Sequence, residues 1–187
     1  SMVPSGASTG SKEAQEIRDN DKKRFLGKGL KGVIKKTEHQ IFDAICQKNL
    51  LDQKEIDNSL IELDGSKNKS NIGANMILAV SMAISKLASQ SENMQLFQYL
   101  HKIAEQFEID SNYSLPLPMM NILNGGAHAN NPLEFQEFMI QPAGFEDFDE
   151  SLRSGIEIFH NLKKELQDNN FSTSVGDEGG FAPNITD

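Results

Sequence analysis

A polar segment that runs into two prolines divides this sequence into two parts with different patterns. Residues 110–114 read Asp-Ser-Asn-Tyr-Ser, and Pro116 and Pro118 follow directly. Turn-forming residues followed by prolines do not continue a helix. The sequence therefore predicts one domain over residues 1–112 and a second over residues 113–187.

Helical periodicity dominates the first part. After a loop of small residues at positions 3–11, we expect a polar helix to begin near Lys12. Apolar side chains at helical spacing predict a second helix, with a stripe formed by Leu30, Val33, Ile34, Thr37, Ile41 and Ile45. Asp52 begins a capping box, and Gly65 is a typical helix end. Residues 72–89 are apolar on all sides, which predicts a helix buried between neighbours.

The second part has the pattern of alternating strands and helices. Residues 119–123 and 135–140 are typical of short buried strands on either side of a loop at 124–131. We expect a long helix from Asp147, which begins another capping box, and a third strand near Thr173. Strands that alternate with helices indicate the α/β class, as a layered sheet or a barrel.

Charge and cysteine content limit the class of protein. Acidic residues number 27 and basic residues 18, so the net charge is −9, and nucleic acid is not a default partner unless a local basic patch binds it. Cys46 is the only cysteine, which excludes an internal disulfide. We expect its side chain to be buried as a small hydrophobic group. The printed residues contain no long apolar run and no signal-peptide pattern. These features predict a cytoplasmic protein without a membrane span.

The strongest candidate for chemistry is the glycine-rich segment at residues 174–184, which contains Asp177 and Glu178. Glycines let the backbone approach a ligand closely, and carboxylates at the end of a strand often transfer protons or bind metal. A solvated turn is the alternative interpretation, because turns favour the same residue types.

Two other loops have a similar composition. Ser8 lies among small residues and either caps a helix or reaches a metal or phosphate from a mobile lid. His128 lies among glycines and asparagines and is either a ligand-binding residue or an ordinary surface histidine. Glu137 stands among apolar residues, where an unpaired carboxylate is costly. Gln136 beside it should face the opposite side of the strand, unless a bulge or a strand end reorients it. Spacings typical of zinc ligands are absent from the sequence, so a bound metal would be held by oxygen, as Mg²⁺ is.

Taken together, these segments closely resemble enolase, the glycolytic lyase that interconverts 2-phosphoglycerate and phosphoenolpyruvate with Mg²⁺. The motifs occur in the order of that family over essentially the whole chain, at residues 3–19, 63–75, 118–126, 136–140 and 175–184. The resemblance implies an α+β N-terminal cap, here mainly helical, followed by the first units of a TIM-like β/α barrel.

The resemblance also implies roles for four residues of the second part. Glu178 is similar to the general acid that protonates the hydroxyl group leaving carbon 3, and Glu137 to the carboxylate that helps to hold this hydroxyl. His128 is similar to the loop histidine that closes towards the substrate phosphate. Gln136 is similar to a glutamine that contacts the substrate.

The first loop carries two further implied positions. Ser8 is similar to the lid serine that completes the coordination of a second, substrate-linked Mg²⁺, and Ala7 is expected to bind substrate beside it. Asp177 is similar to a residue that shapes its loop and is not a catalyst.

Several enolase residues have no counterpart among the printed residues. These are the three acidic ligands of the first Mg²⁺, the lysine that takes the carbon 2 proton, and the cationic residues that grip the phosphate. The resemblance therefore predicts an internal fragment that carries the acid side of the site and is inactive alone. The alternative is a non-catalytic binding or surface-interaction role, with plasminogen or RNA-processing partners. For the full-length protein the resemblance implies a dimer or octamer and a secondary presence at the cell surface.

Overall fold

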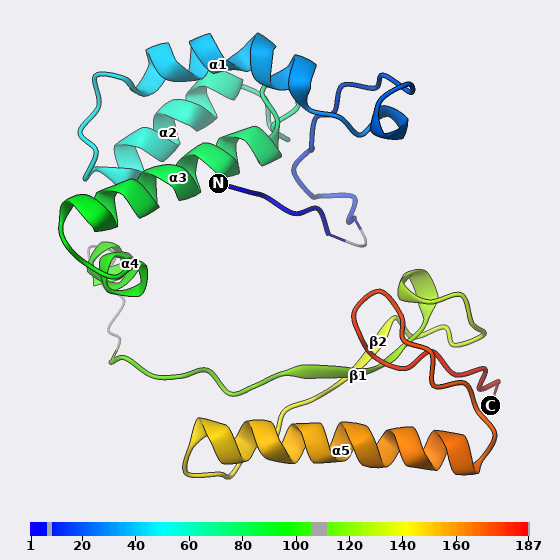
Figure 1. Cartoon of the computed structure of the whole chain (residues 1–187). Coiled ribbons are helices and arrows are strands. Elements are labelled where there is room, and N and C mark those ends of the chain that lie inside the picture. Colours follow the sequence, from blue (N-terminus) through cyan, green and yellow to red (C-terminus); the bar gives the residue numbers. More distant parts are fainter. Residues whose placement is uncertain (7–8, 106–111, 187) are drawn as a thin grey trace. The chain divides into compact units, whose positions relative to one another are not determined.

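The computed structural model of the chain describes residues 1–6, 9–105 and 112–186 (Figure 1). The chain divides into two compact units, one from residues 1–5 and 10–111 and one from residues 6–9 and 112–187. The division falls within the polar segment at residues 110–114, part of which lies outside the described residues. The extent of the two domains stays a prediction.

Four α-helices form the described part of the first unit. They are α1 (Lys31–Ile45), α2 (Gln53–Asp64), α3 (Ala74–Ser91) and α4 (Leu96–Glu105), preceded by the 3₁₀-helix η1 (Phe25–Gly27). Each α-helix packs against the next one along the chain, and Figure 1 shows α1, α2 and α3 side by side.

The core of this unit lies between α1, α2 and the segment that leads into α3. Its buried members are Ile41, Ile56, Leu60 and Ile72. Helix α2 has the ends that the sequence predicts. Its Asp52 cap accepts a hydrogen bond from a backbone N–H of the first turn at 2.8 Å, and Gly65 ends it in the left-handed region with φ 64°.

The polar helix expected from Lys12 does not form, because the chain turns at residues 11–13 and the backbone after the turn bonds to the loop before α3. The N–H of Gln15 donates to the carbonyl of Asn68 at 2.7 Å. The side chain of Asn75 bonds both the N–H and the carbonyl of Ile17, each at 3.1 Å. These long-range partners satisfy the backbone groups that a helix would satisfy internally, so the sequence-based prediction is wrong.

Two expectations about burial in the first unit are also wrong. Helix α3 packs on α2 and α4 but leaves Leu78 and Leu87 about half exposed, at 48% and 52%, so it is not buried on all sides. Cys46 is exposed, because it lies one position beyond the last residue of α1 and not on the buried stripe.

Two antiparallel strands, β1 (Met120–Asn124) and β2 (Glu137–Ile140), pair in the second unit, with the 3₁₀-helix η2 (Gly126–His128) between them. Both strands lie where the sequence predicts them. The pairing places Asn124 at the end of β1 opposite Glu137 at the start of β2. The loop after β1 therefore returns beside the first residues of β2.

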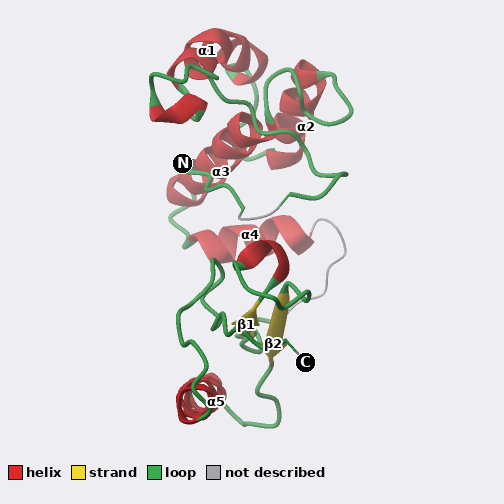
Figure 2. Cartoon of the chain, turned by 90° about the vertical axis from the view of Figure 1, so that its right-hand side faces the viewer, coloured by secondary structure: helices red, strands yellow, loops and turns green. Residues whose placement is uncertain are grey.

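Helix α5 (Phe148–Asp168) begins at the predicted cap, Asp147, and lies against β1 (Figures 1 and 2). The approach is close, because a Cβ atom built on Gly155 would lie 2.2 Å from the Met120 sulfur. The ring of Phe159 stacks on that of Phe181 with 4.3 Å between centroids. Helix α5 therefore packs against both β1 and the C-terminal segment.

Two expectations for this unit are corrected. The segment near Thr173 is not a strand, because only Val175 bridges to Phe181 before the chain turns at Gly176. Strand β2 is not buried in the described part of the chain, since Met139 is 50% exposed.

Helices and paired strands make this an α/β chain, as the sequence predicts. Among the described residues, no helix combines the length and the apolar character that crossing a membrane requires.

Candidate functional site

Three segments of the second unit meet at the imidazole of His128. His128 ends η2 in the loop after β1, Gln136 and Glu137 lie where β2 begins, and Glu178 lies on the glycine-rich turn near the C-terminus. The sequence predicts all four as site residues, and the structure brings them together.

The His128 side chain is only 4% exposed, and both of its ring nitrogens face polar side chains. The Gln136 amide nitrogen lies 2.9 Å from His128 Nε2. Glu137 Oε2 lies 3.5 Å from His128 Nδ1. With the amide of Gln136 donating, Nε2 is the acceptor, so a neutral imidazole carries its proton on Nδ1 and directs it towards Glu137.

The carboxylate of Glu178 approaches the same imidazole from the other side. Its Oε1 lies 3.9 Å from His128 Nε2, beyond a direct hydrogen bond, and its side chain is 45% exposed. A carboxyl group that is fixed near a buried histidine yet open to solvent is available to a ligand. The interpretation of this segment as a site, and not only a solvated turn, gains support from that arrangement.

Gln136 and Glu137 both reach His128 although they are adjacent in sequence. Glu137 is the first residue of β2, and Gln136 lies in the bend before it, where the alternation of a strand does not apply. Because β2 begins at Glu137, the end of the strand lets both side chains turn to the same side.

The turn that carries Glu178 is closed by backbone hydrogen bonds. The N–H of Gly176 donates to the carbonyl of Gly180 at 2.8 Å, and Gly179 occupies the left-handed region with φ 85°. The N–H of Asp177 donates to the carbonyl of His128 at 3.0 Å, which ties the turn to the histidine loop. Asp177 thus contributes a backbone hydrogen bond to the site, and its expected role of shaping the loop stays a prediction.

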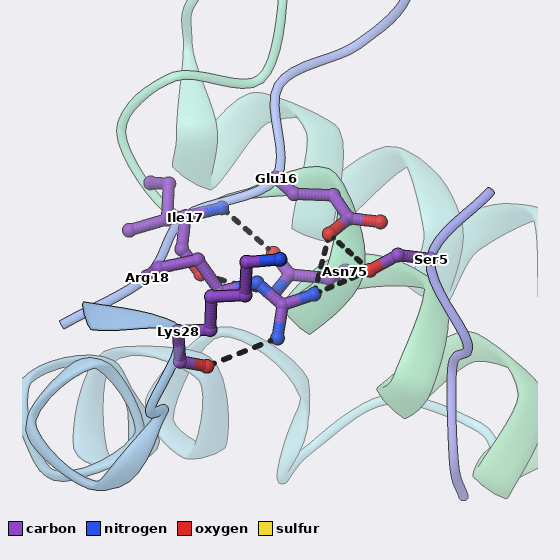
Figure 3. A network of polar contacts seen from close by, with 6 residues as sticks. All are labelled: Ser5, Glu16, Ile17, Arg18, Lys28 and Asn75. Carbon is purple, nitrogen blue, oxygen red and sulfur yellow. Dashed lines mark hydrogen bonds and ion pairs between the residues drawn. The ribbon is translucent and has the colours of Figure 1, made fainter. Parts of the chain in front are cut away.

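Ala7 and Ser8 lie outside the described residues, so their expected contacts with substrate and metal stay predictions. Ser5, two positions before Ala7, is bonded within the first unit (Figure 3). Arg18 Nη2 donates to Ser5 Oγ and to Glu16 Oε2, each at 2.5 Å, and Ser5 Oγ donates to the same carboxylate at 2.7 Å. The hydrogen bonds from Arg18 and Ser5 lower the pKa of Glu16.

The described residues do not by themselves form a metal site. Within residues 1–6, 9–105 and 112–186, no three histidine, cysteine, aspartate or glutamate side chains gather closely enough to hold an ion. Glu137 and Glu178 lie on different ring nitrogens of His128, which separates the two nearest carboxylates. This donor set does not fit Mg²⁺, which requires several oxygen ligands around one point.

A cluster of asparagines, which the sequence patterns do not indicate as a site, lies between β1 and the glycine-rich turn. Asn124 is fully buried, and Asn121 and Asn131 are partly buried beside it. Neither amide atom of Asn121 or Asn124 has a hydrogen-bond partner among the described residues. The sequence signal for this cluster is Asn121, which interrupts the apolar run of β1. A polar side chain in a buried strand normally needs a hydrogen-bond partner, so its presence there is unusual.

Two protein-family models match the chain. The model described as the enolase N-terminal domain matches residues 1–100. The model described as the enolase C-terminal TIM barrel domain matches residues 112–187. The four clustered residues all lie in the second match.

Proposed function

Because the chain belongs to the enolase family, we propose that it carries the acid side of a lyase site that interconverts 2-phosphoglycerate and phosphoenolpyruvate in glycolysis. One observation supports this proposal above the others. His128 lies between Glu137 and Glu178, so two carboxyl groups flank one buried imidazole. The reaction needs this combination of a proton donor and groups that hold a polar substrate.

The chemistry is the loss of water from a three-carbon acid phosphate. A base takes the proton from C2, the electron pair of the C2–H bond becomes the C2–C3 double bond, and the C3–O bond breaks; the printed residues contain no counterpart of the lysine that is this base in the family. Hydroxide is a poor leaving group, so it must take up a proton and depart as water. Glu178 supplies that proton in our proposal, because its carboxyl group is both fixed by the turn and open to solvent.

The remaining three residues bind and orient the substrate. Glu137 holds the departing hydroxyl, and Gln136 contacts the substrate while its amide sets the ring orientation of His128. In our proposal His128 lies beside the substrate phosphate, with its ring held between Gln136 and Glu137. Preorganised polar groups of this kind act strongly where closure excludes water.

The enolase family is generally metal-dependent, and Mg²⁺ is the ion that we propose. Ser8 is the proposed ligand from this chain, although the described carboxylates do not fit an ion. The family in general also binds small-molecule substrates and oligomerises; the dimeric or octameric state and the cytoplasmic location are part of the proposal.

Binding of 2-phosphoglycerate tests this function directly. Calorimetry in buffer with Mg²⁺ should detect binding to the 187-residue chain, and His128→Ala should weaken it at least tenfold. His39→Ala is the matched control, because His39 is an exposed histidine of α1 and should not affect binding. Equal affinity for the chain and the His128→Ala variant contradicts the proposal.

Turnover by these 187 residues alone is not expected. The lysine that removes the carbon 2 proton in the family has no counterpart in the printed sequence. Incubation with 2-phosphoglycerate and Mg²⁺ should therefore yield no phosphoenolpyruvate above the uncatalysed level. Turnover typical of an enzyme would show that the base is present after all.

A further inference from the structure

We propose that Asn124 is a positioning residue that sets the turn of Glu178 against His128. Asn124 belongs to β1 and touches neither carboxyl group in the described contacts. Its importance for catalysis rests on the role proposed for Glu178, but its effect on the position of the turn does not.

The backbone of Asn124 joins β1 to the segment after the turn. Its N–H donates to the carbonyl of Phe181 at 2.8 Å, and its carbonyl accepts a hydrogen bond from the Asn131 side chain at 2.9 Å. The same Asn131 amide donates to the carbonyl of Pro183 at 3.1 Å. Asn124 is therefore fixed to the C-terminal segment directly through its N–H, and through the Asn131 side chain at its carbonyl.

The side chain of Asn124 lies under both ends of the turn. A Cβ atom built on Gly176 would lie 2.7 Å from Asn124 Cβ, and one built on Gly180 would lie 2.8 Å from Asn124 Oδ1. Real Cβ atoms do not approach this closely, so only glycine fits at both positions. Because Gly176 and Gly180 close the turn by their hydrogen bond, Asn124 sets the distance between the whole turn and β1.

The side-chain amide of Asn124 does not stabilise the fold through hydrogen bonds to the described residues. It is fully buried, yet neither its nitrogen nor its oxygen bonds a described residue. A buried amide without partners generally destabilises a fold. Features that oppose stability often occur where a structure serves function, and here the turn above the amide carries Glu178.

The consequence for Glu178 follows from the geometry of the turn. Glu178 lies between the two glycines that rest on Asn124, and the preceding N–H bonds the carbonyl of His128. A longer side chain at position 124 would push the turn away, and a shorter one would let it sink. Either change should separate the Glu178 carboxylate from His128 while Glu137, which lies on β2, keeps its place.

Nuclear Overhauser effects between side-chain protons test this separation in the 187-residue chain without ligand. The wild-type chain should show one contact between the His128 ring and Glu178 and another between the ring and Glu137. In Asn124→Gln and Asn124→Ala, the contact with Glu178 should fall below detection and that with Glu137 should remain. Asn130→Ala is the matched control, because Asn130 is an exposed asparagine of the same loop, and it should retain both contacts.

Retention of both contacts in the two Asn124 variants overturns the proposal. Loss of the β1–β2 cross-strand contacts in these variants also overturns it, because Asn124 would then hold the whole sheet. Gly176→Ala provides a second approach from the side of the turn, and it should likewise remove only the contact with Glu178. Since no ligand is present, these results do not depend on whether 2-phosphoglycerate binds.

Discussion

Oε1 of Glu178 lies 3.9 Å from Nε2 of His128, although one residue belongs to the loop after β1 and the other to a turn near the C-terminus. Two backbone hydrogen bonds produce this approach, one from Asp177 to His128 and one from Phe181 to Ile122, at 3.0 and 2.9 Å. The site therefore depends on how the C-terminal segment docks on β1. Changes to that docking surface should affect the site even when they leave its side chains intact.

Gly180→Ala should displace the turn and destabilise the second unit. The new methyl carbon would lie 2.8 Å from the backbone nitrogen of Leu123, which cannot move away as a flexible side chain can. Overpacking of this kind typically costs about 1–3 kcal/mol. Urea unfolding should report the loss, whereas Gly10→Ala, whose nearest atom would be 3.7 Å away, should change stability little.

Asp64 should make the stability of the first unit depend on pH. Burial raises the pKa of this carboxyl group, but hydrogen bonds from Ser66 and from the N–H groups of Ile72 and Gly73 outweigh burial and lower the pKa to about 2. The carboxylate is thus favoured in the folded state. Its contribution should be complete above the ordinary pKa of 3.8 and should disappear as pH falls towards 2.

Asp64→Asn should accordingly cost roughly 2 kcal/mol at pH 7 and almost nothing near pH 2, because a shift of one pKa unit corresponds to about 1.4 kcal/mol. Unfolding by urea at several pH values measures the difference. Asp43→Asn changes an exposed carboxylate of α1 and serves as the control. A cost of Asp64→Asn that is equal at both pH values would contradict the assignment.

Leu60→Ala should destabilise the first unit by about 2–5 kcal/mol, because Leu60 is fully buried in the core of α1 and α2. Its neighbour Ile61 lies on the same helix but is 42% exposed. Ile61→Ala should therefore cost much less in the same denaturation experiment. Similar losses for the two variants would mean that the core lies elsewhere.

Arg18→Ala should raise the pKa of Glu16 towards its ordinary value, because the hydrogen bond from Arg18 is the largest cause of its lowered pKa. Titration of the Glu16 carboxyl carbon signal by NMR measures this shift. The free energy of unfolding should change by less than about 1 kcal/mol, since the pair is partly exposed. Arg24→Ala is the control and should leave the Glu16 titration unchanged.

Local signals in the sequence predict the helices of this chain well. Asp52 and Asp147 begin helices because a carboxylate at that position bonds an N–H of the first turn, and both bonds are present. Local signals do not predict the structure of the segment after Lys12. Its backbone partners, such as Asn68, are distant in sequence, and no local pattern encodes them.

The site residues were likewise predictable by type but not by arrangement. Glycine-rich loops identify His128 and Glu178 as candidates, and a position among apolar residues identifies Glu137. Their convergence depends on the bond from Phe181 to Ile122, which has no signature in either segment alone. Asn124 carries no such signal, because an asparagine at the edge of a loop is an ordinary feature and only its burial makes it unusual.

Mapping the bound substrate by NMR tests the central claim most directly. On addition of 2-phosphoglycerate with Mg²⁺ to the isotope-labelled chain, the largest shifts should arise from the side chains of His128, Gln136, Glu137 and Glu178. Glu178→Gln should keep the pattern at the other three, because it preserves the shape of the side chain while removing its acid. Shifts confined to other parts of the chain, or no shifts at saturating ligand, would contradict an enolase-type acid site at this position.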